Sequence, residues 1–314
     1  MNNVWENGIF GVVVGDALGC PVQFESRAKV ATHPVRSMRG YGTFNLPEGS
    51  WTDDSSLTLA LLDSITINRD VNLRDIMDNF VKWYTHGEFT PYGYAYDIGG
   101  ATANSIERYI HGKDVDNCGT RGEWENGNGS LMRILPVCIY LAKNCLWGIN
   151  TCISIIHDVS ALTHAHMRSK IACGLYYFMV NEIINGYGTI RERVQRGLND
   201  GFMFYKDEHE ISHYDRLRDL DSFVKLDNRY INSSGYVVDT LEACIWCLLT
   251  SLGYRETLLK AVNLGLDTDT VGAVTGGLAG LFYGYTDIPE EWINVIKKRE
   301  MIHAMCEKAQ KKLG

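Results

Sequence analysis

Two clusters of acidic and hydroxyl residues are the part of this 314-residue chain best suited to chemistry. The first cluster runs Trp51-Thr52-Asp53-Asp54-Ser55-Ser56, and the second runs Asp267-Thr268-Asp269-Thr270. Carboxylate and hydroxyl oxygens suit Mg²⁺, Mn²⁺ or Ca²⁺, and not zinc or copper. If folding brings the clusters together, their four carboxylates are enough for two divalent cations. Such a centre activates water, which points to metal-assisted hydrolysis.

A simpler interpretation is that each cluster only opens a helix. Asp53 precedes a leucine-rich segment, and Asp269 precedes a glycine-rich one. Asp and Thr are favoured at helix N-termini because the first N–H groups lack partners. One Asp would suffice for capping, whereas two adjacent carboxylates repel each other unless a cation lies between them. If residues 267–269 are extended, Asp267 and Asp269 point to the same side. Two such clusters in one chain favour the metal interpretation.

Three further polar motifs are open to more than one interpretation. The turn Gly127-Asn128-Gly129-Ser130 offers N–H groups to an anion such as pyrophosphate, but it could equally be an ordinary turn with a Ser cap. Asp16 lies in the apolar, helix-like segment 11–19, where we interpret it as a structural hydrogen-bonding residue. His164 and His166 begin another helix, and nothing local shows which ring faces a ligand.

Composition narrows the class of protein. Hydrophobic residues make up 45% and charged residues 22% of the chain, as in ordinary globular proteins, and the net charge of −8 argues against a nucleic-acid surface. The N-terminus lacks a signal-peptide pattern, and no apolar run reaches the roughly 20 residues that span a bilayer. The nine cysteines are scattered, and the Cys244–Cys247 pair is interpreted as core packing. We therefore expect reduced thiols, a cytoplasmic location and no membrane partner.

Helical periodicity dominates the chain and predicts an all-α fold in one compact domain, residues 1–314. Three long segments, 20–50, 112–129 and 206–235, lack periodicity and are typical of functional loops. Besides the segments around Val12, Leu175 and Leu241, helices are expected at 55–69, 72–86, 100–111, 130–146, 150–161, 166–186, 189–204, 255–264, 270–283 and 289–311.

The order of the motifs resembles that of the ADP-ribosylglycohydrolase family. The motifs are GDALG (15–19), WTDDS (51–55), GNGSLMR (127–133), THAH (163–166), GYVVDTLEA (235–243) and NLGLDTDTVGAVTGGLAG (263–280). The resemblance runs from about residue 8 to 285. It implies an all-α fold with a central cleft, a binuclear Mg²⁺ or Mn²⁺ centre, and cleavage of the glycosidic bond at C1″ of an ADP-ribosyl group.

The resemblance also implies functions for individual residues. The metal ligands it implies are Thr52, Asp53, Asp54, Asp267, Asp269 and Thr270. The substrate-binding residues it implies are Asp97, Asn128, Gly129, Ser130, His164 and Tyr236. Asp97 is expected near the leaving group. Asp54 and Asp269, two of these metal ligands, are expected to help deprotonate the attacking water.

Two positions depart from the family pattern. Family members commonly carry a Glu seven residues after the Asp of the GD motif, and this chain has Gln23 there. A carboxamide cannot act as a base at neutral pH, although the nearby Glu25 could substitute if the loop shifts. The second departure is Leu266, where the family often has a small or acidic residue.

The predicted function is metal-dependent release of ADP-ribose from a modified protein side chain, most readily arginine, or from a small ADP-ribose-containing molecule. Gln23 leaves a second hypothesis open, namely a catalytically weakened ADP-ribose-binding or immunity-type protein. A metal hydrolase acting on a phosphoester, which would release AMP or phosphate, is a third. A purely structural helical protein is a fourth, and it predicts no stabilisation by metal.

Overall fold

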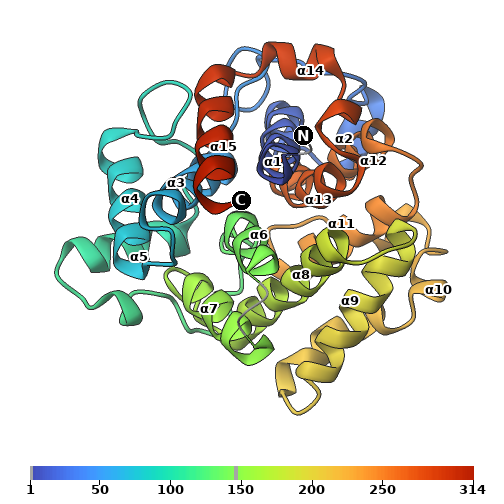
Figure 1. Ribbon diagram of the computed structural model, residues 1–314. Coiled ribbons are helices and arrows are strands. Elements are labelled where there is room, and N and C mark those ends of the chain that lie inside the picture. Colours follow the sequence, from blue (N-terminus) through green and yellow to red (C-terminus); the bar gives the residue numbers. More distant parts are fainter. Residues whose placement is uncertain (1–2, 145–147) are drawn as a thin grey trace.

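The computed structural model describes residues 3–144 and 148–314, and this part of the chain is mostly helical (Figure 1). Within it there is no strand, only two isolated β-bridges, so the predicted all-α class is confirmed. Cys145 and the expected helical residue 146 lie outside the described residues. The α-helices are α1 (Val4–Gly19), α2 (Arg27–Thr32), α3 (Asp53–Asn68), α4 (Leu73–His86), α5 (Gly100–Ile110), α6 (Leu135–Lys143), α7 (Ile149–Ala161), α8 (Met167–Asn185), α9 (Ile190–Phe204), α10 (Leu220–Phe223), α11 (Val237–Leu249), α12 (Tyr254–Val262), α13 (Thr268–Tyr283), α14 (Glu290–Val295) and α15 (Arg299–Leu313).

Short 3₁₀ helices occupy parts of the long segments that lack periodicity. They are η1 (Cys20–Val22), η2 (Val115–Asn117), η3 (His209–Arg218) and η4 (Asn228–Tyr230), and a fifth 3₁₀ helix, η5 (Tyr285–Asp287), lies between α13 and α14. The segment 20–50 also contains the short helix α2, so it is not a continuous loop.

Helices α1 and α13 pack backbone to backbone at the centre of the fold, with α3, α12 and α15 around α1 (Figure 1). Glycine makes this approach possible. A Cβ at Gly11 would lie 2.2 Å from the carbonyl oxygen of Gly276, and one at Gly15 would lie 2.0 Å from that of Gly272. Because no side chain separates the two helices, the end of α1 near Asp16 lies against the start of α13 near Asp269.

The prediction of one helix over 289–311 was wrong, because the chain breaks between α14 and α15. Lys298 adopts a left-handed backbone, with φ 52°. The break is held by residues that precede the first acidic cluster. The Lys297 N–H donates to the Gly49 carbonyl at 3.0 Å, and the Trp51 indole N–H donates to the Lys297 carbonyl at 3.0 Å. Tertiary hydrogen bonds have replaced a helical turn here. The helix expected from 130 also begins later, at Leu135.

The eight described cysteines are buried. Cys244 and Cys247 lie on α11 within the hydrophobic core, which confirms that they serve packing. Among the described residues, no helix has the length and apolar character needed to cross a membrane.

Candidate metal centre

The two acidic clusters meet at the N-termini of α3 and α13. The Thr52 hydroxyl lies 3.4 Å from Asp54 Oδ2 on its own helix and 3.3 Å from Asp269 Oδ2 on the other. The Thr270 hydroxyl donates to Asp54 Oδ2 at 3.3 Å. The fold therefore brings together the side chains that the sequence analysis assigned to one centre.

Asp16 holds the start of α3 in position. Its carboxylate accepts the N–H groups of Thr52 and Ser55 at 3.0 Å and the Ser55 hydroxyl at 2.6 Å. Asp16 is fully buried, and its interpretation as a structural hydrogen-bonding residue is confirmed. Burial raises the pKa of this carboxyl to about 7, although its hydrogen bonds to Ser55 and Thr52 work in the opposite direction.

The capping interpretation does not account for the residues at the helix starts. Thr52 is the N-cap of α3 and Asp267 is the N-cap of α13, yet neither side chain makes a capping hydrogen bond. Both side chains instead bond to other residues of the site, Thr52 to Asp269 and Asp267 to Asn128. The extended geometry considered for residues 267–269 is wrong, because α13 begins at Thr268. Helical geometry, not strand alternation, decides where Asp269 points.

In the absence of a cation, the ionised form of the carboxylates in this centre is strongly disfavoured. Burial raises the pKa of Asp53, Asp54 and Asp269 well above the usual range, and neighbouring carboxylates raise it further. Asp54 Oδ1 and Asp269 Oδ1 are buried and have no hydrogen-bond partner among the described residues. Buried carboxylates of this kind need a compensating positive charge. The donor set, carboxylates with hydroxyls, fits Mg²⁺ or Mn²⁺.

A cavity of about 330 Å³ opens directly onto this cluster. No lysine or arginine is among the described residues that line it, so the negative charge is not neutralised from its walls. The lining residues are Gln23, Phe24, Asp53, Asp97, Ile98, Gly99, Gly100, Ala101, Thr102, Gly127, Asn128, Gly129, Met132, His164, Gly235, Asp267 and Thr270.

The glycine-rich turn forms part of the cavity wall. Asn128 Nδ2 donates to Asp267 Oδ2 at 2.6 Å and to the Thr240 hydroxyl at 2.9 Å. The Asn128 N–H donates to the Gly235 carbonyl at 3.0 Å, next to an isolated bridge between Gly127 and Tyr236. These contacts couple the turn to the second acidic cluster.

His164 lines the cavity as a neutral ring. Burial, with a smaller effect from Arg133, lowers its pKa to about 3. The Thr163 hydroxyl accepts from Arg133 Nη2 at 2.8 Å and lies 2.8 Å from His164 Nδ1. Thr163 can then donate its proton to Nδ1, which leaves the proton on Nε2, an assignment made from the hydrogen-bond network. The ring packs against Gly129, where a Cβ would lie 2.8 Å from Cε1.

Four other predicted site residues differ in their position relative to the cavity. Gln23 and Asp97 line it. Burial raises the pKa of Asp97 and of Asp267, and a hydrogen bond from Gln23 to each carboxyl works in the opposite direction. Glu25 is instead paired with Lys29 at 2.9 Å and is not among the lining residues. The Ser130 hydroxyl is buried and accepts from Ser160 at 2.9 Å, away from the lining.

Tyr236 lines a neighbouring cavity of about 580 Å³, which shares Gly127 and Gly235 with the acidic one. The guanidinium of Arg168 lies 5.9 Å from the centre of its ring. Sequence reasoning did not single out several residues that complete the main cavity, such as Phe24, Ile98 and Thr102. The position of Phe24 beside Gln23 was the one local signal available, since Ile98 and Thr102 belong to no polar motif.

Glu123, His166 and Glu210 form a second possible metal site, with ligand atoms within 4.8 Å of one another. The side chain of Arg168 lies among them. It contacts Glu123 Oε1 at 2.7 Å and Glu210 Oε2 at 2.8 Å. This arginine already supplies a positive charge, so the acidic cavity is the site whose carboxylates most need a cation.

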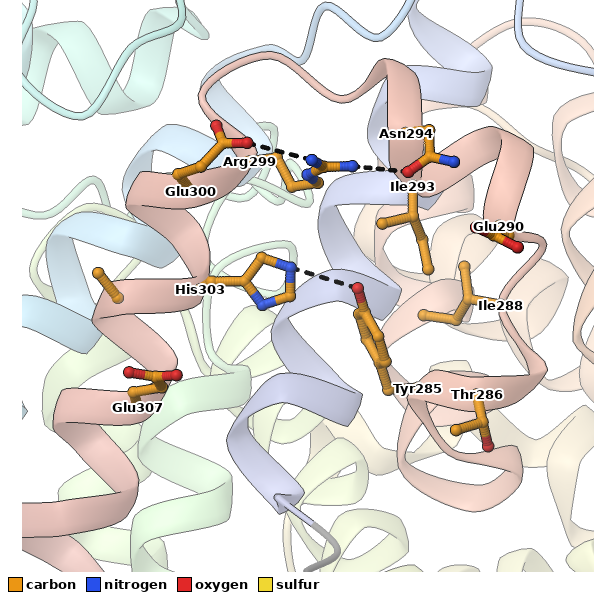
Figure 2. Close-up of a pocket in the computed structure, with 11 residues that line it drawn as sticks. Tyr285, Thr286, Ile288, Glu290, Ile293, Asn294, Arg299, Glu300, His303 and Glu307 are labelled. Atoms are coloured by element: carbon orange, nitrogen blue, oxygen red, sulfur yellow. Dashed lines mark hydrogen bonds and ion pairs between the residues drawn. The ribbon is translucent and has the colours of Figure 1, made fainter.

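A separate pocket of about 620 Å³ lies between α14 and α15, and none of its lining residues belongs to the acidic cavity (Figure 2). Tyr285 and His303 are 3.3 Å apart across it, and Arg299 bonds to Asn294 and Glu300. In Figure 2 the carboxylates of Glu300 and Glu307 lie well apart along α15. This pocket therefore lacks the convergent carboxylates seen at the N-termini of α3 and α13.

Comparison with known proteins agrees with this geometry. The family model described as ADP-ribosylglycohydrolase matches residues 6–313. The chain belongs to the ADP-ribosylglycohydrolase family. Members of this family are hydrolases, and this chain is one of them.

Individual relatives extend over most of the chain. An ADP-ribosylarginine hydrolase Tri1 of Serratia proteamaculans is 31% identical over 96% of this chain and 77% of its own length. An ADP-ribosyl-[dinitrogen reductase] glycohydrolase of Rhodospirillum rubrum is 29% identical over 90% of this chain and 87% of its own. A solved structure titled ADP-ribosylglycohydrolase-related protein complex superposes with a TM-score of 0.80 and 28% identity, covering 99% of this chain and 98% of that one.

Proposed function

We propose that this chain hydrolyses the glycosidic bond between ADP-ribose and a protein side chain, with arginine as the preferred acceptor, and releases ADP-ribose. One observation carries the proposal: Asp53, Asp267 and Thr270 line one cavity, and Thr270 bonds to Asp54, whose buried Oδ1 has no partner among the described residues. The names of the two bacterial relatives, which refer to ADP-ribosylarginine and ADP-ribosyl dinitrogen reductase, support the substrate class. We also propose that residues 1–314 form one domain, since α1 packs against the C-terminal helices α13 and α15.

The acidic residues are proposed to hold two divalent cations, Mg²⁺ or Mn²⁺. The ligands would be Thr52, Asp53, Asp54, Asp267, Asp269 and Thr270, which supply carboxylate and hydroxyl oxygens. When bound, such cations polarise ribose hydroxyls and lower the pKa of a water molecule. In their absence the same carboxylates repel one another, so metal binding is expected to stabilise the fold.

The remaining lining residues are proposed to bind ADP-ribose. Asn128 and Gly129 line the cavity, while the buried hydroxyl of Ser130 supports the turn through Ser160. His164, neutral at physiological pH, is suited to hydrogen bonding and not to charge. Tyr236, in the adjoining cavity, offers an aromatic face for the outer part of the substrate.

The chemistry requires a base for water and a stabilised leaving group. Asp54 Oδ1 and Asp269 Oδ1, buried and unpartnered, are the proposed proton acceptors. Glycosidic cleavage passes through an oxocarbenium-like transition state, which nearby carboxylates stabilise electrostatically. Asp97 Oδ2 is also unpartnered and is proposed to hold a leaving guanidinium. Glu25 is a weaker candidate base than in the sequence analysis, because it is paired with Lys29.

The second candidate function is that of an ADP-ribose-binding or immunity-type protein with weakened catalysis. Gln23 favours it, because its carboxamide occupies the cavity where family members commonly have a carboxylate. An amide can bind but cannot take up a proton from water at neutral pH.

Release of free ADP-ribose from arginine-ADP-ribosylated protein distinguishes the candidates. It is measured with Mg²⁺ and with EDTA, for the wild type, Asp53→Ala and Gln23→Glu. Metal-dependent release by the wild type, lost in Asp53→Ala, supports hydrolysis. Release only by Gln23→Glu supports the binding protein. AMP or phosphate as the product contradicts both and favours a phosphoesterase.

A further inference from the structure

A row of aromatic side chains extends outward from the cavity. Phe24 lines the cavity, and its ring centre lies 6.4 Å from that of Phe44. Phe44 is 5.5 Å from Tyr96, which is 5.9 Å from Tyr94. We call these four residues, Phe24, Phe44, Tyr94 and Tyr96, the aromatic rim. They come from two segments distant in sequence, so local sequence does not explain their assembly.

Two of the four residues of the aromatic rim, Phe24 and Tyr94, are exposed beside the cavity, and Phe44 and Tyr96 are half-buried. Phe24 is 64% exposed and Tyr94 is 52% exposed, and Ile98, another lining residue of the cavity, is 37% exposed. Scattered exposed apolar residues are ordinary, but a contiguous group at the mouth of a cavity indicates a contact surface. The surface is continuous with the cavity because Phe24 belongs to both.

The aromatic rim is anchored to the segment that carries the first acidic cluster. The Tyr96 hydroxyl donates to the Trp51 carbonyl, and the hydroxyls of Tyr92 and Ser50 are 2.5 Å apart. Trp51 immediately precedes Thr52. The rings are therefore positioned relative to the proposed metal ligands, as a surface that aligns a substrate must be.

The backbone at the mouth of the cavity is strained. Phe24 and Leu266 both have φ 64° and Asp97 has φ 55°, in the left-handed region that bulky residues avoid. The Phe24 N–H donates to the Leu266 carbonyl at 2.6 Å, so the two strained residues hold each other. Leu266 is 44% exposed and Phe24 is 64% exposed, so the strained backbone does not bury either of these two side chains in the core. Strain retained without a gain in burial is typical of ligand-contacting segments.

We propose that the aromatic rim binds the polypeptide segment that flanks the ADP-ribosylated side chain. The inference rests on the proposed function and names the partner of the same site. A modified side chain whose ADP-ribose is held inside the cavity must leave through the mouth, which places its main chain on the surrounding surface. Uncharged ring faces suit apolar and arginine side chains of that segment through packing and cation–π contact. Gln23 Oε1, buried and unpartnered at the same end of the cavity, is available to accept an N–H from the modified side chain.

The test compares two substrates that share the ADP-ribosyl group and differ in what carries it. One is arginine-ADP-ribosylated protein and the other is ADP-ribosylated free arginine. The variants are Phe44→Ser and Tyr94→Ser, singly and together, because neither residue lines the cavity. Tyr187→Ser and Leu252→Ser, at exposed positions outside the aromatic rim, are the matched controls. Tyr94→Phe tests whether an aromatic ring alone is sufficient.

The double variant is expected to lose about tenfold in kcat/KM on the modified protein, through KM, and less than about twofold on ADP-ribosylated arginine. Tyr94→Phe and the controls should match the wild type on both substrates. An equal loss of kcat/KM on both substrates, or no loss on the modified protein, overturns the proposal that the aromatic rim binds the flanking polypeptide. Either result leaves the proposed hydrolase activity intact.

If the wild type releases no ADP-ribose from either substrate, the proposed function fails. The role of the aromatic rim is then tested by the binding of a modified peptide. Fluorescence anisotropy of a labelled arginine-ADP-ribosylated peptide then replaces turnover. Binding by the wild type about tenfold tighter than by the double variant, with equal affinity of both for free ADP-ribose, supports the aromatic rim. Equal affinity of both proteins for the peptide overturns it.

Discussion

The hydroxyl of Thr52 lies 3.3 Å from Oδ2 of Asp269, although 217 positions separate the two residues in the sequence. This contact joins the start of α3 to the start of α13. It exists because Asp16, near the end of α1, holds α3 while glycines of α1 allow α13 to approach. The proposed metal centre is thus built on three helices.

Asp269→Asn should raise the metal-free melting temperature, and it should abolish both turnover and the stabilisation that Mg²⁺ gives the wild type. Burial and the neighbouring Asp267 raise the pKa of Asp269, so its charge opposes folding when no cation is present. Differential scanning fluorimetry with Mg²⁺ or EDTA measures both effects. An unchanged Mg²⁺-induced shift in the variant would remove Asp269 from the ligand set. Asp239→Asn is the control, because Asp239 accepts from Asn232 and Ser234 and belongs to neither acidic cluster.

Gln23→Glu should tighten Mg²⁺ binding and lower the metal-free stability. The new carboxylate would be 4% exposed if the side chain keeps its place, and it would join Asp97 and Asp267, which are already destabilised by burial. Isothermal titration calorimetry gives the affinity, and urea unfolding in EDTA gives the stability. Gln195→Glu, on the exposed side of α9, should change neither. Weaker Mg²⁺ binding in Gln23→Glu would show that the amide itself is the better partner for the cation.

Asp16→Ala should destabilise the protein by about 3 kcal/mol, because it leaves buried N–H and hydroxyl groups of Thr52 and Ser55 without an acceptor. Metal affinity should fall as well, since the start of α3 loses its support. Urea unfolding and Mg²⁺ titration measure the two effects. Asp63→Ala, on the same α3 but partly exposed, is the matched control. Loss of stability without loss of metal affinity would show that Asp16 does not position the proposed metal ligands.

Gly15→Ala should lower the free energy of unfolding by about 3 kcal/mol and reduce activity. The added Cβ would lie 2.0 Å from the Gly272 carbonyl oxygen, so α13 must shift away from α1 and carry Asp269 with it. Gly253→Ala is the control, because a Cβ there meets nothing within 4 Å. Chemical unfolding and the ADP-ribose release assay measure the outcome. A fully active, stable Gly15→Ala protein would contradict the backbone contact between these helices.

The contribution of His157 to stability should fall as the pH drops from about 6.5 toward 4. Burial lowers the pKa of this ring from 6.5 to about 4, so in this window the unfolded chain binds a proton that the folded protein excludes. The free energy of unfolding therefore decreases with acid by up to about 1.4 kcal/mol per pH unit for this group.

His157→Gln should reduce this acid sensitivity, whereas His209→Gln, at an exposed ring, should not. Urea unfolding at pH 7.5, 5.5 and 4.5 measures the effect. An unchanged pH slope in His157→Gln would mean that the ring is already protonated or accessible in the folded state.

Local patterns in the sequence were sufficient for the helical class and for the chemical character of the acidic clusters. Helix formation follows periodicity over a few turns, which is why α3, α4 and α13 begin and end close to the expected residues. Carboxylates adjacent in sequence remain adjacent in any fold, so Asp53 and Asp54 indicated a cation before any contact was known. The order of the motifs also predicted the family, and the match of the family model to residues 6–313 confirms it.

Contacts between distant segments decided the remaining features. The break at Lys298 depends on Gly49 and Trp51, which lie far away in the sequence. This contact leaves no periodic signal. The aromatic rim likewise arises from two segments that meet only after folding.

The sequence by itself determined which residues carry oxygen ligands, which segments are helical and which family the motifs indicate, because these properties are local or lie in the order of residues along the chain. Only the tertiary structure decided that Thr52 meets Asp269, that Asp16 supports α3, and that Phe24 faces both the cavity and solvent. The physical reason is that close packing of α1 against α13, through glycine, fixes distances between residues that no local interaction relates.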